Sequence, residues 1–200
     1  MTTPTTTETS IPTDEDLMAA LRAGDDAALA PLMERWELSV KGFLLRLGLP
    51  MADVEDVAQE AFVRLYEKRT SYHVGSAFKP WLLTIAGNLG RNKLRWRFRR
   101  REDSIQAIDE TQPGGFQHAD AAASSAADAA EKTNLAQSVR AAVNALPNNL
   151  REAVLNVELE ELSYREAAQV MGCSEKAVET RLYRARALLK VTLGKWLAGE

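Results

Sequence analysis

The sequence predicts an all-α protein: two helical domains joined by a flexible acidic linker. Apolar residues recur at helical spacing over almost the whole chain outside residues 102–133. Aromatic residues make up only 6% of the 200, with 11 Gly and 7 Pro, which disfavours an all-β barrel or sandwich. The net charge of −3 conceals a segregation, because seven basic side chains fall within Arg91–Arg101 and residues 102–132 then carry seven acids against Lys132 alone.

The composition also indicates what the protein is not. The single cysteine, Cys173, excludes a disulfide framework, and two histidines without a paired-cysteine or His-Glu-x-x-His motif indicate no zinc site. No apolar run approaches 18 residues, and the N-terminus lacks the basic and apolar regions of a secretory signal. We expect a cytoplasmic protein that is not an enzyme, with no cofactor, small-molecule substrate or membrane insertion.

Composition shifts divide the chain into four segments. Residues 1–13, with seven Thr and one charged side chain, predict a disordered tail. Residues 14–101 and 134–200 predict the two domains, and residues 102–133, which include Pro113-Gly114-Gly115, predict the linker. As a flexible coil this linker averages roughly 30 Å end to end, and fully stretched it reaches about 100 Å. Its acidic composition indicates either an extended anionic chain that occupies a positively charged channel of a partner or a merely solubilising linker, and the sequence favours neither.

Four helices are predicted in the first domain. Thr13 is the expected N-cap of the first, with Asp16 at its third position and Gly24 as its stop. The second helix is expected after Asp25-Asp26 and runs toward Gly48, with Pro31 near its start or at a kink. The third follows Pro50 and runs from Met51 to about Lys68. A polar loop over 69–77 precedes the fourth helix, which begins at Phe78. Gly87 and Gly90 weaken the fourth helix by ~1 kcal/mol each and permit close backbone approach.

The second domain contains a predicted helix-turn-helix. Ser163 and Glu166 have the spacing of a capping box, and Gly172 ends that short helix. A second helix is expected from Glu175 to about Lys190. It carries outward polar side chains suited to base edges and phosphates: Ser174 at the cap, then Lys176, Glu179, Thr180, Arg181, Tyr183 and Arg184. The alternative is an amphipathic helix with a solvated face.

Two further patterns lie in the first domain. Asp53, Asp56, Gln59 and Glu60 recur at helical spacing and form one acidic face, which is either a binding surface or a solvated face with favourable acids near a helix start. On the basic fourth helix, Asn88, Asn92, Arg91 and Arg95 follow Trp81, which we expect in the core.

These motifs, in this order, resemble the extracytoplasmic-function sigma factors, the small bacterial sigma factors that have only sigma domains two and four. The resemblance rests on D-x-x-D-x-x-Q-E (Asp53–Glu60), F-x-x-W-L-x-x-I-A-x-N (Phe78–Asn88) and the helix-turn-helix, and covers residues 14–101 and 134–192. It implies a sigma factor that binds the β and β′ subunits of core RNA polymerase and directs promoter-specific initiation, with promoter DNA and an anti-sigma factor as partners.

The resemblance also implies roles for individual residues. The acidic face (Asp53, Asp56, Gln59, Glu60) would dock on the coiled coil of the polymerase β′ subunit. The loop Tyr72-His73-Val74-Gly75-Ser76 would accept a nucleotide flipped from the minus-ten element, Asn88 and Asn92 would contact base edges, and Arg91 and Arg95 would hold phosphates. Domain four would read the minus-thirty-five element through the outward set of its second helix and grip the β flap.

Some residues depart from the family pattern. Glu179 stands where a basic or small polar side chain is expected, and the loop at 72–76 lacks an expected charged residue. Two other functions stay open. One is a stand-alone helix-turn-helix regulator, which leaves the acidic helix unexplained. The other is a sigma mimic that titrates an anti-sigma factor, which has no need of base-reading residues.

Overall fold

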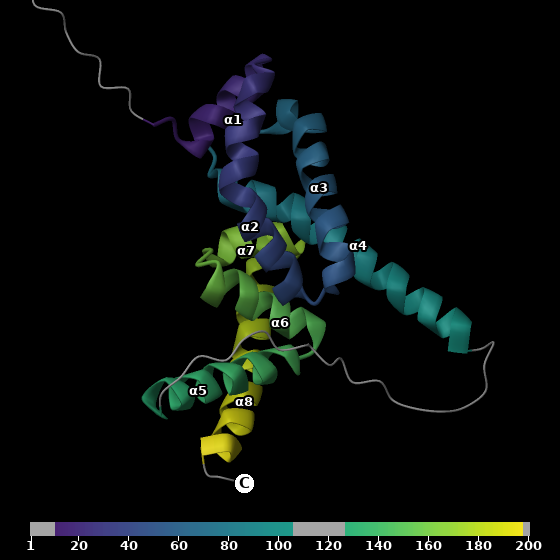
Figure 1. The fold of residues 1–200 in the computed structure, drawn as a ribbon, viewed down its shortest axis with the longest axis vertical. Coiled ribbons are helices and arrows are strands. Elements are labelled where there is room, and N and C mark those ends of the chain that lie inside the picture. Colours follow the sequence, from purple (N-terminus) through teal and green to yellow (C-terminus); the bar gives the residue numbers. More distant parts are fainter. Residues whose placement is uncertain (1–10, 106–126, 198–200) are drawn as a thin grey trace, which may run out of the picture.

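The computed structural model describes residues 11–105 and 127–197, and these residues form helices and turns without a β-strand (Figure 1). The helices are α1 (Asp14–Ala23), α2 (Leu29–Leu47), α3 (Met51–Glu67), α4 (Phe78–Ile105), α5 (Ala127–Asn144), α6 (Asn148–Val154), α7 (Tyr164–Met171) and α8 (Glu175–Leu197). The predicted all-α class is confirmed. Within the described residues no helix is long and apolar enough to cross a membrane.

The predicted domain boundaries remain predictions. Residues 1–10, most of the expected tail, and 106–126, most of the expected linker, lie outside the described residues. We refer below to residues 11–105 as the N-terminal domain and to residues 127–197 as the C-terminal domain.

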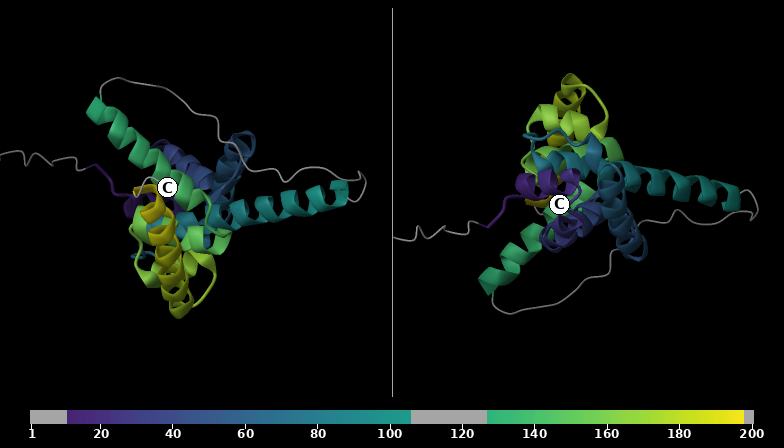
Figure 2. Two further views of the ribbon diagram at one scale, coloured as in Figure 1. Left: turned by 90° about the horizontal axis from the view of Figure 1, so that it is seen from below. Right: turned by 90° about the horizontal axis from the view of Figure 1, so that it is seen from above.

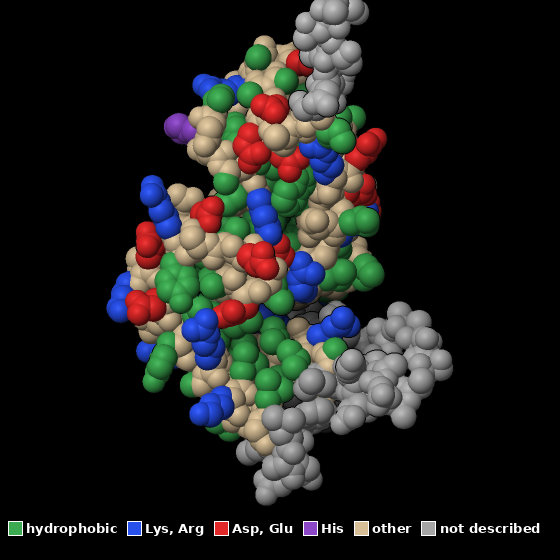
Figure 3. Space-filling view, turned by 90° about the vertical axis from the view of Figure 1, so that its left-hand side faces the viewer, with side chains coloured by type: hydrophobic (Ala, Val, Ile, Leu, Met, Phe, Trp, Pro, Cys, Tyr) green, Lys and Arg blue, Asp and Glu red, His purple; other side chains and the backbone are tan. Residues whose placement is uncertain are grey.

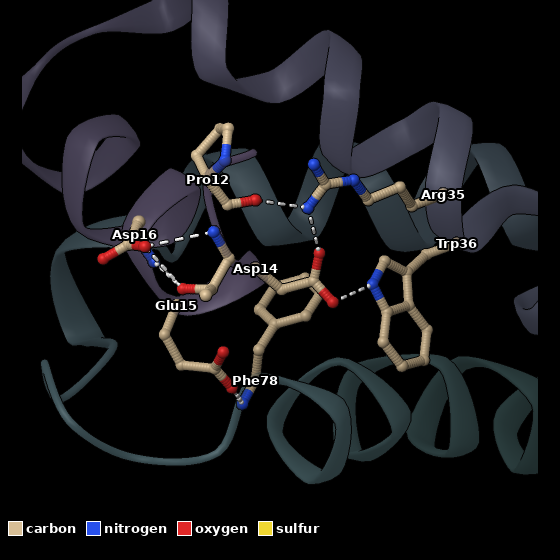
Figure 4. Close-up of polar contacts among 8 residues, drawn as sticks. Pro12, Asp14, Glu15, Asp16, Arg35, Trp36 and Phe78 are labelled. Carbon is tan, nitrogen blue, oxygen red and sulfur yellow. Dashed lines mark hydrogen bonds and ion pairs between the residues drawn. The ribbon is translucent and has the colours of Figure 1, made fainter. Parts of the chain in front are cut away.

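The first turn of α1 joins three helices (Figure 4). Thr13 Oγ1 accepts the backbone N–H of Asp16 at 3.1 Å, and Asp16 Oδ2 accepts the backbone N–H of Thr13 at 3.0 Å, so the predicted cap is a full capping box. Asp14 accepts hydrogen bonds from Arg35 and from the indole of Trp36 on α2. Glu15 Oε1 accepts the backbone N–H of residue 78 at 3.0 Å and so caps the start of α4.

The core of the N-terminal domain depends on the close crossing of α2 and α4. At Gly90, a Cβ atom would lie 2.7 Å from Leu47 Cδ2 and 3.1 Å from Leu44 Cδ2, which leaves no room for a side chain. The expected close approach is therefore found at this glycine. Pro31 lies in the first turn of α2, where its missing N–H and fixed φ are tolerated. Trp81 is half-buried and packs edge-on against Tyr72, with ring centroids 5.2 Å apart.

In the C-terminal domain the predicted helix-turn-helix is present. Ser163 and Glu166 form a capping box at the start of α7, and the helix ends at Gly172 in the left-handed conformation, with φ of 62°. The second helix, α8, begins at Glu175 as predicted but extends to Leu197, beyond the expected end at Lys190. A small apolar cluster holds α8 against α6 and the turn before it, and Val143 of α5 packs against this cluster: Leu146, Leu150, Val154, Leu182 and Ala185.

The two domains are in direct contact. One cluster of buried apolar residues includes most of the N-terminal core together with residues of α6, α7 and the start of α8. Helix α7 packs against the first half of α4, whose second half projects away from the body (Figures 1 and 2). The sequence predicts two domains joined by a flexible linker, and the structure adds a packed interface between them.

Candidate nucleic-acid and protein-binding surfaces

The acidic face of α3 divides into an inner and an outer part. The Asp53 carboxylate is mostly buried and pairs with two cations of α4, Lys93 at 3.2 Å and Arg97 at 2.7 Å. Asp56 and Gln59 are exposed, and the half-buried Glu60 pairs with Arg64 one turn later, at 2.8 Å. The structure thus leaves three of the four predicted residues available to a partner, whereas Asp53 joins α3 to α4. Sequence periodicity alone does not separate these roles.

A groove that sequence reasoning missed runs beside this face, between α2 and α3. It has a volume of about 480 Å³ and is lined mainly by apolar side chains, among them Met33, Phe62 and Val63, with Gln59 at its rim. Val63 is half exposed although it is apolar. No local pattern in the sequence marks this groove, because a single exposed apolar side chain such as Val63 is common on protein surfaces.

An ion-pair network crosses the rim of the groove. Lys41 of α2 pairs with Glu37 on its own helix and with Glu55 of α3, both at 2.6 Å. Hydrogen bonds to these two carboxylates raise the pKa of Lys41, and the Lys41 ammonium lowers the pKa of Glu55. The rim is therefore charged and the floor apolar, which suits an amphipathic helix that carries basic residues.

The loop after α3 presents four of its five predicted residues. His73, Val74, Gly75 and Ser76 are exposed, and Gly75 has a φ of 90°, which favours glycine. Tyr72 instead lies in the core with 1% of its surface exposed. Its hydroxyl donates a short hydrogen bond to the backbone carbonyl of Ser76, and burial raises its pKa. Tyr72 therefore holds the two ends of the loop together and does not present its ring.

The predicted DNA-reading residues of α4 lie along one face of the helix, which is exposed at Asn88, Asn92 and Arg95 and half-buried at Arg91. Asn88 and Asn92 are exposed, and each accepts a hydrogen bond from the arginine three positions later. Arg91 Nη2 donates to Asn88 Oδ1 at 2.6 Å, and Arg95 Nη2 donates to Asn92 Oδ1 at 2.7 Å. Such bonds orient each amide beside a cation, as expected for a surface that meets bases and phosphates. Arg91 differs from Arg95 because it also contacts the C-terminal domain.

Trp96 is a residue of α4 that sequence reasoning missed. Its indole is 45% exposed on the projecting half of the helix, and the guanidinium of Arg100 lies 4.5 Å from the ring centroid. An exposed aromatic ring flanked by cations is typical of nucleic-acid-binding helices. The alternating Arg-Trp-Arg-Phe-Arg residues from Arg95 to Arg99 are the signal for it.

Most of the predicted reading set of α8 is exposed. Ser174 Oγ accepts the backbone N–H of residue 177 at 3.2 Å and caps the helix, and Lys176 pairs with Glu179 at 2.8 Å. Thr180, Tyr183 and Arg184 are also exposed. Arg181 is the exception. Its side chain is half-buried and Nη1 donates to Cys173 Sγ at 3.4 Å, so in this conformation it turns toward the interface between the domains.

Comparisons with known proteins match both domains. The family model "Sigma-70 region 2" matches residues 32–102, and "Sigma-70, region 4" matches residues 136–189. The chain is 34% identical over 178 residues to the ECF RNA polymerase sigma-E factor of Escherichia coli, covering 87% of this chain and 91% of that one. It is 32% identical over 173 residues to the RNA polymerase sigma-H factor of Pseudomonas aeruginosa, covering 86% and 90%.

A solved structure is also similar over most of the chain. It is the sigma factor RpoE in complex with the anti-sigma factor NepR from Bartonella quintana. The TM-score is 0.62 and the sequences are 25% identical, with 82% of this chain and 96% of that one covered.

Proposed function

Because this chain belongs to the ECF family of RNA polymerase sigma factors and directs transcription initiation, we propose that its surfaces divide that work between the two domains. The N-terminal domain docks on core polymerase and opens the minus-ten element, and the C-terminal domain reads the minus-thirty-five element. The observation that carries this assignment is that one chain presents an acidic face on α3 together with two polar, basic helices, α4 and α8. A stand-alone repressor or activator needs only the last of these.

Docking on core polymerase uses the outer part of the α3 face. Asp56 and Glu60 offer carboxylates to basic residues of a β′ helix, and charge-assisted hydrogen bonds of this kind are about twice as strong as neutral ones. The apolar groove beside them, with Phe62 and Val63, receives the apolar side of the same helix. Asp53 is a positioning residue, since its contacts with Lys93 and Arg97 hold α4 beside α3.

Promoter opening uses the exposed loop and the DNA-reading face of α4. Residues 73–76 receive a flipped nucleotide, whose unstacking and unpairing cost a few kcal/mol that the loop and the backbone contacts must offset. Asn88 and Asn92 contact base edges, while Arg91 and Arg95 hold phosphates. Trp96 extends this surface along α4 with a stacking platform.

On α8 the exposed residues read the minus-thirty-five element in the major groove. The pairing of Glu179 with Lys176 reduces the repulsion that the acid would exert on phosphates, and its carboxylate suits a cytosine amino group. Arg181 joins this set when its guanidinium no longer donates to Cys173 Sγ.

The remaining partners follow from the same assignment. The similar RpoE structure holds an anti-sigma factor, and we propose that such a protein also restrains this chain. The protein acts in the cytoplasm on polymerase and DNA, without catalysis, cofactor or small-molecule substrate of its own.

Charge reversal on α3 tests the docking face. We expect Asp56→Lys with Glu60→Lys to abolish binding to core polymerase and transcription from a cognate promoter, while circular dichroism shows an unchanged helix content. The control is Glu67→Lys on the same helix, an exposed acid outside the groove, which should bind core normally. Core binding by the double variant at wild-type affinity would refute the assigned face. If the wild-type protein shifts promoter DNA specifically but never binds core, the chain acts as a stand-alone regulator.

A further inference from the structure

The loop assigned to the flipped nucleotide is a closed turn. Ser76 donates its backbone N–H to the carbonyl of His73 at 3.0 Å, and Gly75, the third residue of this turn, has a positive φ of 90°. The Tyr72 hydroxyl donates to the carbonyl of Ser76. Only residue 77 separates this turn from α4, so the shape of the loop depends on how α4 begins.

The sequence gives α4 no local cap at its start. Residue 77, which precedes the helix, is alanine, whose side chain has no oxygen to accept a hydrogen bond from the first turn. Pro80, the third residue of α4, has no N–H at all. The N–H of Phe78 instead donates to Glu15 Oε1 at 3.0 Å, and Glu15 lies 63 positions earlier in the sequence. Helix α4 therefore takes its cap from another helix, α1.

Glu15 is itself held in place through α2 (Figure 4). Its neighbour Asp14 accepts hydrogen bonds from Nη1 of Arg35 at 3.0 Å and from the indole N–H of Trp36 at 2.8 Å. The Trp36 ring then packs edge-on against the buried ring of Phe78, with ring centroids 5.6 Å apart. Because α1 holds the N–H of Phe78 and α2 holds its ring, the first turn of α4 is anchored to the body of the domain.

Helix α1 also reaches the other end of the loop. It packs against the short 3-10 helix η2 (Arg69–Ser71), which precedes the loop. Burial raises the pKa of Tyr72 and the charge of the Glu15 carboxylate raises it further, so this carboxylate lies near the hydroxyl that closes the turn. The Tyr72 ring packs against Trp81 of α4. Both ends of the loop are thus fixed relative to α1.

The charge around Glu15 favours a contact within the protein over a contact with DNA. Asp14, Glu15 and Asp16 form the acidic first turn of α1. In Figure 3 several acidic side chains lie close together at the upper end of the molecule, where Figure 1 places α1. Carboxylates repel phosphates, so this end of the protein does not suit the DNA backbone. Glu15 therefore affects DNA through the loop that it holds.

A loop that is held in this way needs little ordering when a base arrives. Without the Glu15 carboxylate, the Phe78 N–H loses its partner and the first turn of α4 is free to fray. Residues 76–78 must then be ordered as the nucleotide binds, and the conformational entropy lost in that step lowers the affinity. The cap therefore contributes to base capture by preorganising the loop.

We propose, on the basis of the function proposed above, that Glu15 is a positioning residue for capture of the flipped minus-ten nucleotide. Its carboxylate caps α4 from α1 and so keeps the loop at 73–76 in the conformation that receives the base. Helix α1 thereby takes part in promoter opening, although its residues lie outside the sets assigned to DNA.

Oligonucleotides with and without a base test the proposal. Holoenzyme assembled from the full chain and core polymerase is titrated against a fluorescent single strand that carries the minus-ten non-template sequence of a promoter transcribed by the wild type. In a matched set, each base of the element is removed in turn to leave an abasic site. The ratio of the affinities with and without the base measures base capture, because the backbone contacts are the same in both strands.

Three variants separate the hydrogen bond from the charge. Glu15→Ala removes the acceptor, whereas Glu15→Gln removes the charge but keeps an oxygen that accepts the Phe78 N–H. Glu34→Ala is the charge-matched control, because Glu34 is an exposed acid of α2 without a hydrogen bond or ion pair among the described residues. A fourth variant, Glu15→Ala with Ala77→Asn, gives α4 a local cap in place of the distant one.

We expect Glu15→Ala to lower the affinity ratio at the captured position about fivefold, the effect of one lost helix cap on an equilibrium. Glu15→Gln and Glu34→Ala should keep the wild-type ratio, and the Ala77→Asn double variant should recover most of the loss. Binding to core polymerase should be equal in all variants, because α3 is unchanged. A wild-type ratio in Glu15→Ala, or an equal loss in Glu15→Gln or Glu34→Ala, would overturn the role of Glu15.

Amide hydrogen exchange in the wild-type chain tests the cap without any variant that could fail to fold. The N–H of Phe78 should be protected, and exchange at the rate of a free amide would overturn the proposal. A different outcome bears on the function proposed above. If the wild-type holoenzyme loses no affinity at any abasic position, base capture by the loop is itself wrong, whatever Glu15 does.

Discussion

Replacing Gly90 by alanine tests the close crossing of α2 and α4, on which the position of the DNA-reading face of α4 depends. The added methyl would lie 2.7 Å from Leu47 Cδ2, 3.1 Å from Leu44 Cδ2 and 3.3 Å from Leu49 Cδ1. All three leucines are buried in the core, so their side-chain ends have little space into which to move. The methyl must therefore displace packed atoms or push α4 away from α2.

The magnitude comes from two opposing effects. Alanine is favoured over glycine in a helix interior by about 1 kcal/mol. Overpacking a close-packed core costs about 1–3 kcal/mol. We therefore expect Gly90→Ala to lower the free energy of unfolding by about 0–2 kcal/mol. Gly42→Ala on α2 is the control, because a Cβ atom there meets only the end of the exposed Arg46 side chain, at 3.3 Å.

Urea unfolding, followed by circular dichroism, measures both variants. The helix-propensity gain is common to the two, so their difference in unfolding free energy isolates the packing cost of about 1–3 kcal/mol, with Gly42→Ala the more stable. The same samples should show weaker promoter opening with core for Gly90→Ala, because Asn88 and Asn92 flank this position on α4. Equal stability of the two variants would refute the reasoning.

Three further changes have defined outcomes. Burial raises the pKa of Glu152 although Arg91 favours its ionised form, so the stability from this site is fully present below pH 4.5 and is lost as the pH rises through the raised pKa. Glu152→Gln should flatten this pH dependence of the urea unfolding midpoint, measured from pH 4.5 to 8. An unchanged slope of midpoint against pH would contradict this expectation. Ser163→Ala removes the side-chain oxygen that caps α7 and bonds Glu166, so it should lower the free energy of unfolding, measured by thermal unfolding, by about 1 kcal/mol. No loss would mean that water replaces the cap. Arg181→Ala should cost about 1–3 kcal/mol of discrimination if this residue reads a guanine, and uniform loss over all sequences in competition binding would make it a phosphate contact.

Features that depend on near neighbours in the chain were predictable. The capping boxes at Thr13 and Ser163 and the stops at Gly24 and Gly172 each involve residues three or four positions apart, and all four are found. The family assignment was also predictable, because each motif that carries it is a short stretch of chain and the motifs follow one another along the sequence in the order of the family.

Features that depend on distant residues were not predictable. Asp53 has the same helical spacing as the outer acids, but its partner Arg97 lies 44 positions away. Tyr72 belongs to a polar loop, yet its ring is buried against Trp81. The interface between the domains joins residues as far apart as Arg46 and Glu160, which are 114 positions apart in the sequence. No local sequence pattern predicts that pairing.

The basic run of α4 shows why sequence charge overstates the surface that DNA meets. Lys93 and Arg97 are turned toward Asp53 of α3, and Arg91 is turned toward Glu152. The cation of Arg95 instead lies exposed beside Asn92. Because non-specific DNA binding grows with each phosphate that a cation neutralises, pairing three cations internally weakens it. Of these three cations only Arg91 pairs with the other domain, since the contacts of Asp53 lie within one domain and keep α4 beside α3.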